Sequence, residues 1–325
     1  MSRLSLGLML AVCAALPASL LAGQVWIDPT QPITANAALI LVQLRLPRAV
    51  LALIIGAGLG GAGAAMQGYL RNPLADPGLF GIAPSAALGA VLCLWLGALG
   101  MPFGPWALPI FALAGAAAAM ALLGLIAART GGTTLFTLAG MMIASLAGSL
   151  TSLAISLAPS PFALSQIVTW LMGALADRSW ADVLVAAPLT ALGLGALALT
   201  GRALDALTLG EDTARSLGLS PGRLQGLIIA GVGLAVGGAV AVAGIIGFVG
   251  LMVPHLVRPF TNRRPSALLL PSALAGSLLL LVADSLCRLF PLEGGELRLG
   301  IALSLLGAPF FLALLLRMRG QGWGA

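Results

Sequence analysis

The side chains that could do chemistry are few and scattered along the chain. His255 is the only histidine, and the three cysteines, Cys13, Cys93 and Cys287, have no CxxC spacing. Redox and metal sites need paired axial ligands or clustered cysteines and histidines. The chain has no lysine, so it cannot contain the GxxxxGK[ST] loop that cradles nucleotide phosphates. We therefore expect no catalytic residues, no metal site and no cofactor bound by this chain.

Two charged residues interrupt an otherwise apolar stretch near the C-terminus. Asp284 and Arg288 are four residues apart, so they can pair on one face of a helix. Ionisable residues inside membrane spans often mark the path of a transported ion. A local ion pair near an outer end of the span is the competing interpretation. Apart from this pair, the apolar stretches are almost free of charge.

Composition identifies a membrane protein. Hydrophobic residues make up 60% of the 325 positions and charged residues 8%, and the mean hydropathy is +1.08. Apolar stretches of this kind cross a bilayer as helices, because a lipid-exposed backbone must satisfy its own polar groups. Small residues, as in GAGLGGAGAAMQG at 56–68, let such helices approach closely. The predicted fold class is all-α, with about ten transmembrane helices in a single domain over 1–325.

The apolar stretches give the positions of these helices. Leu224 to Val257 is uncharged but too long for one crossing, and arginines flank it on both sides, so we divide it near 244–247. Residues 1–23 are either a cleaved signal peptide or a retained helix, and the length of the apolar run favours retention. The predicted spans are 4–22, 48–69, 79–99, 106–128, 133–158, 182–201, 224–243, 247–257, 266–289 and 299–316.

All of the positive charge is arginine. The net charge of +6 reflects membrane topology, and no basic patch with interleaved aromatic residues suggests a nucleic-acid partner. With the N-terminus in the cytoplasm, the outer side has five arginines (45, 48, 178, 288 and 298). The cytoplasmic side then has eleven (3, 71, 129, 202, 215, 223, 258, 263, 264, 317 and 319). This bias predicts a multi-pass protein with a cytoplasmic N-terminus.

One long polar segment, LDALTLGEDTARSLGLSPGRL at 204–224, separates two apolar stretches. Glu211 and Asp212 stand at the start of a short helical pattern and Arg215 in its next turn, as the helix dipole favours. Gly218 and Pro221 end the pattern. We predict a short helix outside the membrane. Composition leaves open whether it is a solvated connector or a docking surface.

Several segments together resemble the FecCD-type permeases, the membrane subunits of bacterial ABC importers for iron siderophores, haem and vitamin B12. The similarity runs in order from about Trp26 to Leu316. It is carried by RLPR at 45–48, MQGYLRNPLADPGLFGI at 66–82, LGEDTARSLGL at 209–219, GFVGLMVPHLVR at 247–258 and GIALSLLGAPFFLALL at 300–315.

The resemblance implies a ten-helix subunit that works as a homodimer in the bacterial inner membrane, with the translocation path along the dimer axis. It also implies two ATPase subunits, which bind ATP and Mg²⁺, and a periplasmic substrate-binding protein. Ferric siderophore is the favoured substrate because it is the commonest in the family, with vitamin B12 or haem next. The rival from another class is a stand-alone secondary transporter or channel.

The resemblance also assigns sites. Asn72, Leu74, Thr133 and Thr134 match cytoplasmic gate positions. The coupling segment, 205–222, is expected to dock on the ATPase, and its matched residues are Gly210, Glu211, Ala214, Arg215, Leu217 and Gly218. Arg45, Arg48 and Arg288 match positions that dock the binding protein. The alternative is that Arg45 and Arg48 anchor a helix at the headgroups and Arg288 pairs with Asp284.

Other matched positions are expected to be structural. His255 is interpreted as a capping or packing residue rather than a ligand. Met141, Met142 and Met172 are interpreted as packing residues. Arg298 stands where the family usually has a proline, so the start of the last helix is expected to differ and to affect partner or substrate preference.

Overall fold

The chain is a bundle of helices. The computed structural model describes residues 2–23, 27, 34–130, 132–289, 291–292 and 295–320. The side chains of Arg317 and Arg319, two of the predicted cytoplasmic arginines, lie outside this description. The first elements are α1 (Arg3–Leu21), α2 (Ala35–Leu39), the π-helix η1 (Ile40–Arg45), α3 (Leu46–Tyr69), the 3₁₀-helix η2 (Pro77–Phe80), α4 (Ile82–Ala98), α5 (Ala107–Thr130), α6 (Thr133–Ser156), α7 (Pro161–Leu171) and α8 (Trp180–Leu199).

The second half continues the bundle with α9 (Gly201–Leu207), α10 (Glu211–Ser216), α11 (Pro221–Ala243), α12 (Val249–Val257), the 3₁₀-helix η3 (Arg258–Phe260), α13 (Pro265–Leu289) and α14 (Leu299–Gly320). Two short antiparallel strands, β1 (Pro291–Leu292) and β2 (Gly295–Glu296), precede α14. Among the described residues, eight helices are long and apolar enough to cross a membrane, and α4 is a shorter apolar helix. The predicted fold class, an all-α membrane protein, is confirmed.

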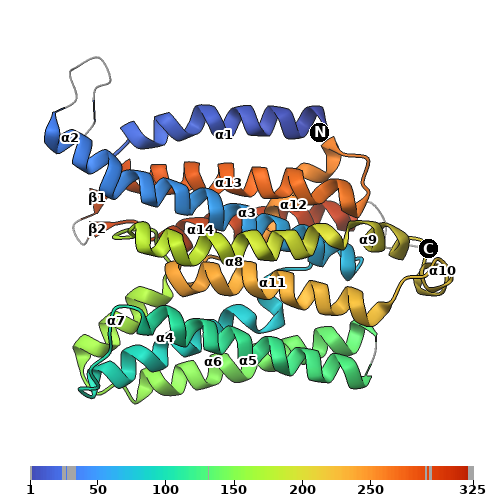
Figure 1. The fold of residues 1–325 in the computed structure, drawn as a ribbon, viewed down its shortest axis with the longest axis horizontal. Helices are drawn as coiled ribbons and strands as arrows, with labels where there is room; N and C mark the ends of the chain where they lie inside the picture. The colour runs from blue at the N-terminus through green and yellow to red at the C-terminus, as the bar shows by residue number, and fades with distance from the viewer. Residues whose placement is uncertain are drawn as a thin grey trace.

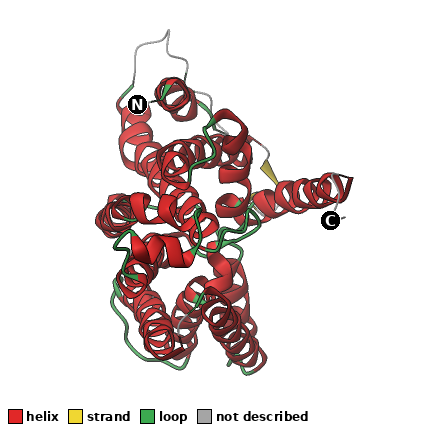
Figure 2. Ribbon diagram, turned by 90° about the vertical axis from the view of Figure 1, so that its right-hand side faces the viewer, coloured by secondary structure: helices red, strands yellow, loops and turns green. Residues whose placement is uncertain are grey.

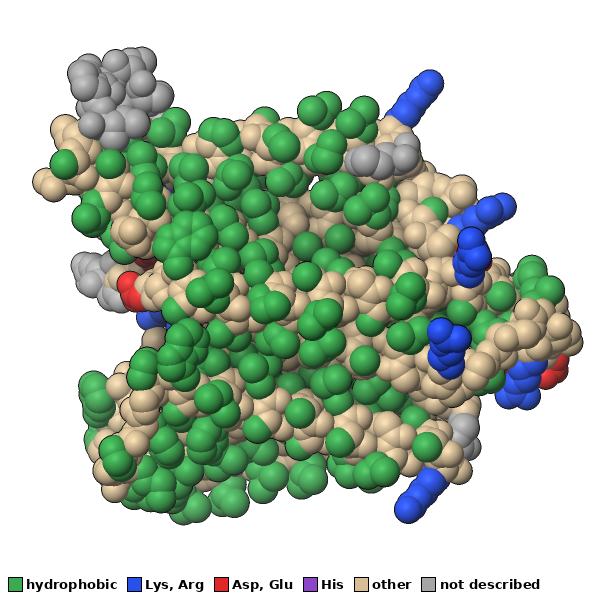
Figure 3. Space-filling view, viewed as in Figure 1, with side chains coloured by type: hydrophobic (Ala, Val, Ile, Leu, Met, Phe, Trp, Pro, Cys, Tyr) green, Lys and Arg blue, Asp and Glu red, His purple; other side chains and the backbone are tan. Residues whose placement is uncertain are grey.

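The long helices lie roughly along one axis (Figure 1). The N-terminus, α9 and α10 lie at one end of the bundle, which we call the α10 end. The elements α2, α7, β1 and β2 lie at the opposite end, which we call the α7 end. Hydrophobic side chains cover the middle of the face in Figure 3, and blue arginine side chains gather at the α10 end. This distribution is that of a membrane-spanning bundle with its charges at the interfaces.

The long uncharged stretch is divided where the sequence predicted. Helix α11 ends at Ala243, and α12 begins at Val249. Gly244 has a φ of +72°, and a side chain there would meet the carbonyl oxygen of Trp170. Phe248 is also left-handed, with a φ of +67°. The chain therefore leaves the helix at a position that only glycine occupies without strain.

Two helical features differ from the predicted spans. The span expected to begin at Arg48 is the end of a continuous helical run, Ala35–Tyr69, that includes η1. An arginine predicts a span boundary, but Arg45 and Arg48 have partners inside the bundle, so the helix continues through them. Helix α7 was not predicted, because its 11 residues are too few for an ordinary crossing.

Helix α3 packs through glycine at the centre of the bundle. A side chain at Gly56 would meet the backbone of Gly276 in α13, and one at Gly63 would meet the backbone of Gly250 in α12. Both contacts require the backbones to approach more closely than any Cβ allows. Figure 2, a view along the bundle, shows the helices side by side, with the C-terminal helix extending away from the rest.

Replacing Gly63 with leucine should prevent this close approach. Because the clash is with backbone rather than with a flexible side chain, we expect Gly63→Leu to yield little or no monodisperse protein in detergent. The matched control is Gly195→Leu in α8, where nothing lies within 4 Å of an added Cβ. Size-exclusion chromatography after heating would measure both variants. Equal thermal stability of the two variants would contradict the packing described here.

Candidate coupling and gate site

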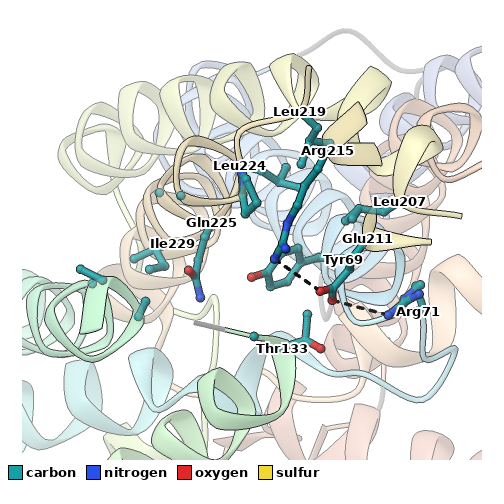
Figure 4. A pocket seen from close by; sticks show the side chains of 17 residues that line it. Tyr69, Arg71, Thr133, Leu207, Glu211, Arg215, Leu219, Leu224, Gln225 and Ile229 are labelled. Carbon is teal, nitrogen blue, oxygen red and sulfur yellow. Dashed lines mark ion pairs between the residues drawn. The ribbon is translucent and has the colours of Figure 1, made fainter. Parts of the chain in front are cut away.

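A cavity of about 370 Å³ lies at the α10 end, where α3, α6, α10 and α11 meet (Figure 4). It brings together segments that are far apart in the sequence. Its polar lining consists of Tyr69 at the end of α3, Arg71 just after it, Thr133 at the start of α6, Glu211 and Arg215 of α10, and Gln225 of α11. The cavity therefore joins a predicted gate residue to two predicted coupling residues.

Two ion pairs converge on Glu211. An Nη2 of Arg71 lies 3.7 Å from Glu211 Oε1, and an Nη2 of Arg215 lies 4.0 Å from Oε2 (Figure 4). All three side chains are exposed, so each pair adds roughly 0–1 kcal/mol to stability. The contribution to stability is small, but the geometry links the segment after α3 to the coupling segment.

The backbone at Arg71 is held in an unusual conformation. Its φ is +50°, in the left-handed region that costs a non-glycine residue roughly 1 kcal/mol. This residue turns the chain out of α3 and into the loop 70–76, which we call the gate loop. Asn72 closes the turn, because its Oδ1 accepts a hydrogen bond of 2.9 Å from the backbone N–H of Leu74.

Helix α10 is set by its two flanking glycines. Gly210 has a φ of +100° and Gly218 a φ of +84°, and nothing lies within 4 Å of a Cβ added at either position. The backbone angle, rather than space, therefore selects glycine here. Ala214 is fully buried and anchors the helix, whereas Leu217 is 66% exposed. The short helix predicted from its capping pattern is present.

The predicted gate residues are not all together. Thr133 lines the cavity, whereas Asn72, Leu74 and Thr134 are not among its described lining residues. Asn72 is exposed in the gate loop, and its backbone N–H donates to the carbonyl oxygen of Gln67. The gate positions therefore remain a prediction, and only Thr133 is seen beside the coupling residues.

Charged residues form a second cluster at the α7 end. Arg48 donates two hydrogen bonds of 2.9 Å to Asp284, which is fully buried, and its Nη2 lies 2.7 Å from Glu296 Oε2. Arg288 lies on the other side of Asp284, with Nε 3.3 Å from Oδ2. The carboxylates of Asp284 and Glu296 together balance the charges of the two guanidinium groups.

Arg45 and Arg288 also donate hydrogen bonds to the C-terminal end of α1. Arg45 donates to the carbonyl oxygens of Leu20 and Leu21 at 2.8 and 2.9 Å. Arg288 donates to Ser19 Oγ at 2.7 Å and to the carbonyl oxygen of Ala22 at 3.1 Å. Carbonyl groups at the end of a helix have no partner within it, so the arginines serve as its cap.

The docking role expected of Arg45, Arg48 and Arg288 stays a prediction, and in this structure the three side chains are engaged within the chain itself. Arg45 and Arg288 are buried, with exposed fractions of 8% and 4%, and the side chain of Arg48 is 12% exposed. Their guanidinium groups are directed into the bundle and do not form an outer rim. The alternative pairing of Arg288 with Asp284 is observed, and Arg48 shares the same carboxylate.

Comparison with known proteins identifies the family. The model of the FecCD transport family matches residues 8–317. The chain belongs to the FecCD transport family.

Relatives of this FecCD family chain are transport permeases rather than enzymes. It is 42% identical over 288 residues to YvrB, an uncharacterised ABC transporter permease protein of Bacillus subtilis, covering 87% of this chain and 80% of that one. It is 38% identical over 317 residues to BtuC, a vitamin B12 import system permease protein of Klebsiella pneumoniae, covering 97% and 94%. A solved metal-chelate type ABC transporter in an inward-facing conformation superposes with a TM-score of 0.89 at 30% identity, covering 98% of this chain and 100% of the other.

Sequence reasoning missed several contacts of this FecCD permease. Tyr69 and Arg71 lie within the motif quoted for the gate, but neither was assigned a role. Gln67 was also missed: its Nε2 donates to the carbonyl oxygen of Leu251 in α12, and Arg258 donates to its Oε1 at 2.7 Å. A lone glutamine within the small-residue face at 56–68 was the available signal.

The packing role predicted for three methionines is not seen within this chain, and the role of His255 stays a prediction. His255 lies edge to face with Phe310, with ring centroids 6.2 Å apart. Met141, Met142 and Met172 are exposed rather than packed in the core. Within the described part of the chain, no group of three His, Cys, Asp or Glu side chains could hold a metal ion.

Exchanging the charges of the Arg71–Glu211 pair tests the link between gate loop and coupling segment. We expect Glu211→Arg to lower substrate uptake by the assembled transporter about tenfold, because like charges would then face each other across the cavity. Adding Arg71→Glu should restore most of the uptake, since the pair is re-formed with opposite polarity. Membrane levels should stay near those of the wild type, because the pair is exposed. Failure of the double variant to recover would contradict a direct interaction.

The cluster at the α7 end predicts a stability difference between two acidic residues. Asp284→Asn should lower the free energy of unfolding by about 3 kcal/mol or more, because two buried arginines lose their shared carboxylate. Glu296→Gln should cost less than about 1 kcal/mol, because its carboxylate is partly exposed. Unfolding in mixed detergent micelles would compare them. The reverse order would show that Asp284 does not organise the cluster.

Proposed function

We propose that this chain is the membrane-spanning permease subunit of an ATP-driven importer. It works as a homodimer in the bacterial inner membrane, with two ATPase subunits below and a periplasmic substrate-binding protein above. The N-terminus and the α10 end face the cytoplasm, in agreement with the arginine bias. ATP with Mg²⁺ is bound and hydrolysed by the partner subunits. This chain supplies the path and its gates.

The observation that carries the proposal is apolar surface on the coupling segment. Leu209 and Leu217 are 63% and 66% exposed at the α10 end, beyond the helices that can cross the membrane. Figure 3 shows hydrophobic and charged side chains side by side on the projection at this end. Leucines in water beside a buried anchor, Ala214, are typical of a surface that a partner protein covers.

A second apolar surface supports the homodimer. The final helix, α14, extends away from the bundle (Figure 2), and several of its leucines are more than half exposed, namely Leu305, Leu306, Leu312 and Leu316. A helix with few neighbours in its own chain gains contacts when two copies associate about a twofold axis. The translocation path would then lie between the two copies.

Closure of the ATPase subunits would move the gate through the cavity of Figure 4. Glu211 joins α10 to Arg71 at the start of the gate loop. The coupling segment is also held to the bundle, because Asp205 accepts hydrogen bonds of 2.9 and 2.6 Å from Ser266 at the start of α13. We infer that the coupling segment and the gate loop move as one body.

The transported substrate is proposed to be a metal chelate, with ferric siderophore as the first candidate. The metal-chelate transporter that superposes over 98% of this chain supports that class. Vitamin B12 is the second candidate, because the BtuC relative matches along 97% of the chain.

Substituting the exposed leucines tests the docking surface. We expect Leu209→Asp with Leu217→Asp to abolish co-purification of the ATPase subunit encoded with this permease, because charge replaces the apolar contact. The control is Arg3→Asp, at the same end but on the peripheral helix α1. The permease alone should hydrolyse no ATP. Undiminished association of the double variant, or hydrolysis by the isolated chain, would refute the proposal.

A further inference from the structure

A second cavity, of about 400 Å³, lies at the α7 end, opposite to the coupling segment. It is formed by α7, the connection from α7 to α8, and the residue that precedes α14. Arg178 and Arg298 both line it, together with Asp177, Gln166 and Trp170. Arg298 is the residue expected to make the start of α14 differ from the family pattern.

Two hydrogen-bond donors of this cavity are buried without a partner. They are Nε of Arg178 and Nε1 of Trp170. Buried donors are nearly always paired, so a donor left without an acceptor requires an explanation. Both belong to side chains that line the same cavity, and neither group can accept a hydrogen bond. Each of the two groups therefore lacks an acceptor among the described residues.

The charge of the cavity also favours a ligand that accepts hydrogen bonds. Neither Arg178 nor Arg298 forms a salt bridge among the described residues. Burial lowers the pKa of Arg178. The carboxylates of Asp182 and Asp177 raise this pKa, and the positive charge of Arg298 lowers it, so the two arginines are within electrostatic reach of each other. Asp182 is engaged elsewhere, because it accepts hydrogen bonds from the backbone and hydroxyl of Ser179. With two arginines and one aspartate, Asp177, in its lining, the cavity has a net positive charge.

Backbone contacts fix the two chain segments that carry these arginines. The N–H of Gly300, in the first turn of α14, donates to the carbonyl oxygen of Gly173 at 3.1 Å, and the N–H of Ala174 donates to Ala243 at 2.9 Å. A side chain at Gly300 would meet the carbonyl oxygen of Met172. The connection after α7 and the start of α14 are thereby fixed against each other. Because the two segments are fixed, less backbone entropy is lost when an anion binds between them.

We propose that this outer cavity binds the anionic groups of the transported chelate and selects negatively charged chelates over neutral ones. The proposal rests on the permease function above and narrows its substrate class. Anionic chelates, such as those whose metal is held by catecholates or whose ring bears carboxylates, present several oxygens that accept from guanidinium groups. Neutral hydroxamate chelates and cobalamin lack that charge. Arg178 and Arg298 are the specificity-determining residues.

Tryptophan fluorescence of the full-length permease in lipid nanodiscs tests this inference. The probes are ferric tris-catecholate, which is a trianion, and neutral ferric tris-hydroxamate. We expect saturable quenching by the trianion that is absent in Trp170→Phe and weakens as salt is added. Arg178→Gln and Arg298→Gln should each weaken apparent binding about tenfold, as loss of a charge-assisted hydrogen bond predicts. Asp177→Asn should strengthen it.

The control variant is Arg263→Gln, an exposed arginine between α12 and α13. It should bind the trianion like the wild type. Equal binding of the neutral chelate, or unchanged binding in the Arg178 and Arg298 variants, would overturn the inference. The measurement needs no ATPase or binding protein, so such a result would leave the permease assignment intact. The permease assignment is tested separately, by co-purification of the ATPase subunit with the Leu209→Asp, Leu217→Asp variant.

Discussion

The close approach of α3 to its neighbours is the contact on which the rest of the structure depends. Gly56 and Gly63 allow its backbone to lie directly on the backbones of α13 and α12. Most of its residues are consequently buried, in a bundle whose other long helices, apart from α11 and α13, expose much of their surface. Without a hydrophobic driving force between helices in lipid, such packing is a main source of stability.

Both ends of α3 carry charged residues that its packing positions. At the α7 end, Arg48 reaches the buried carboxylate of Asp284 on α13. At the α10 end, the helix stops at Tyr69, and Arg71 turns toward Glu211 of the coupling segment. The two clusters differ in kind: the first is buried and stabilises the fold, whereas the second is exposed and adds little stability. The exposed pair joins the segment after α3 to the coupling segment.

Features encoded by local rules could be predicted from the sequence. The break after Ala243 followed from an uncharged stretch that was too long for one crossing, and the short helix at Glu211 followed from its capping and charge pattern. Both depend on neighbours in the chain. The FecCD family could also be recognised from the sequence, because each of its motifs is a contiguous segment.

Features that depend on distant residues could not be predicted in this way. Arg48 was placed on the outer side of the membrane, but its pairing with Asp284 was not predicted, because the two residues are 236 positions apart in the sequence. Arg71 and Glu211 are also far apart in the sequence, so their ion pair could not be predicted. Arg178 and Arg298 are likewise distant in the sequence, yet they line one cavity beside the start of α14. A charge in an apolar sequence shows that a partner must exist, but only the fold shows which one.

The most direct measurement of the account is a cross-link between the gate loop and the coupling segment. Arg71→Cys and Glu211→Cys would be introduced into a chain whose three free cysteines are replaced by alanine, and joined by a short reducible bifunctional reagent. If the two segments move as one body, the cross-linked transporter retains its ATP-driven uptake. Loss of uptake on cross-linking, with recovery after reduction, would show that they must separate during transport and would contradict the account.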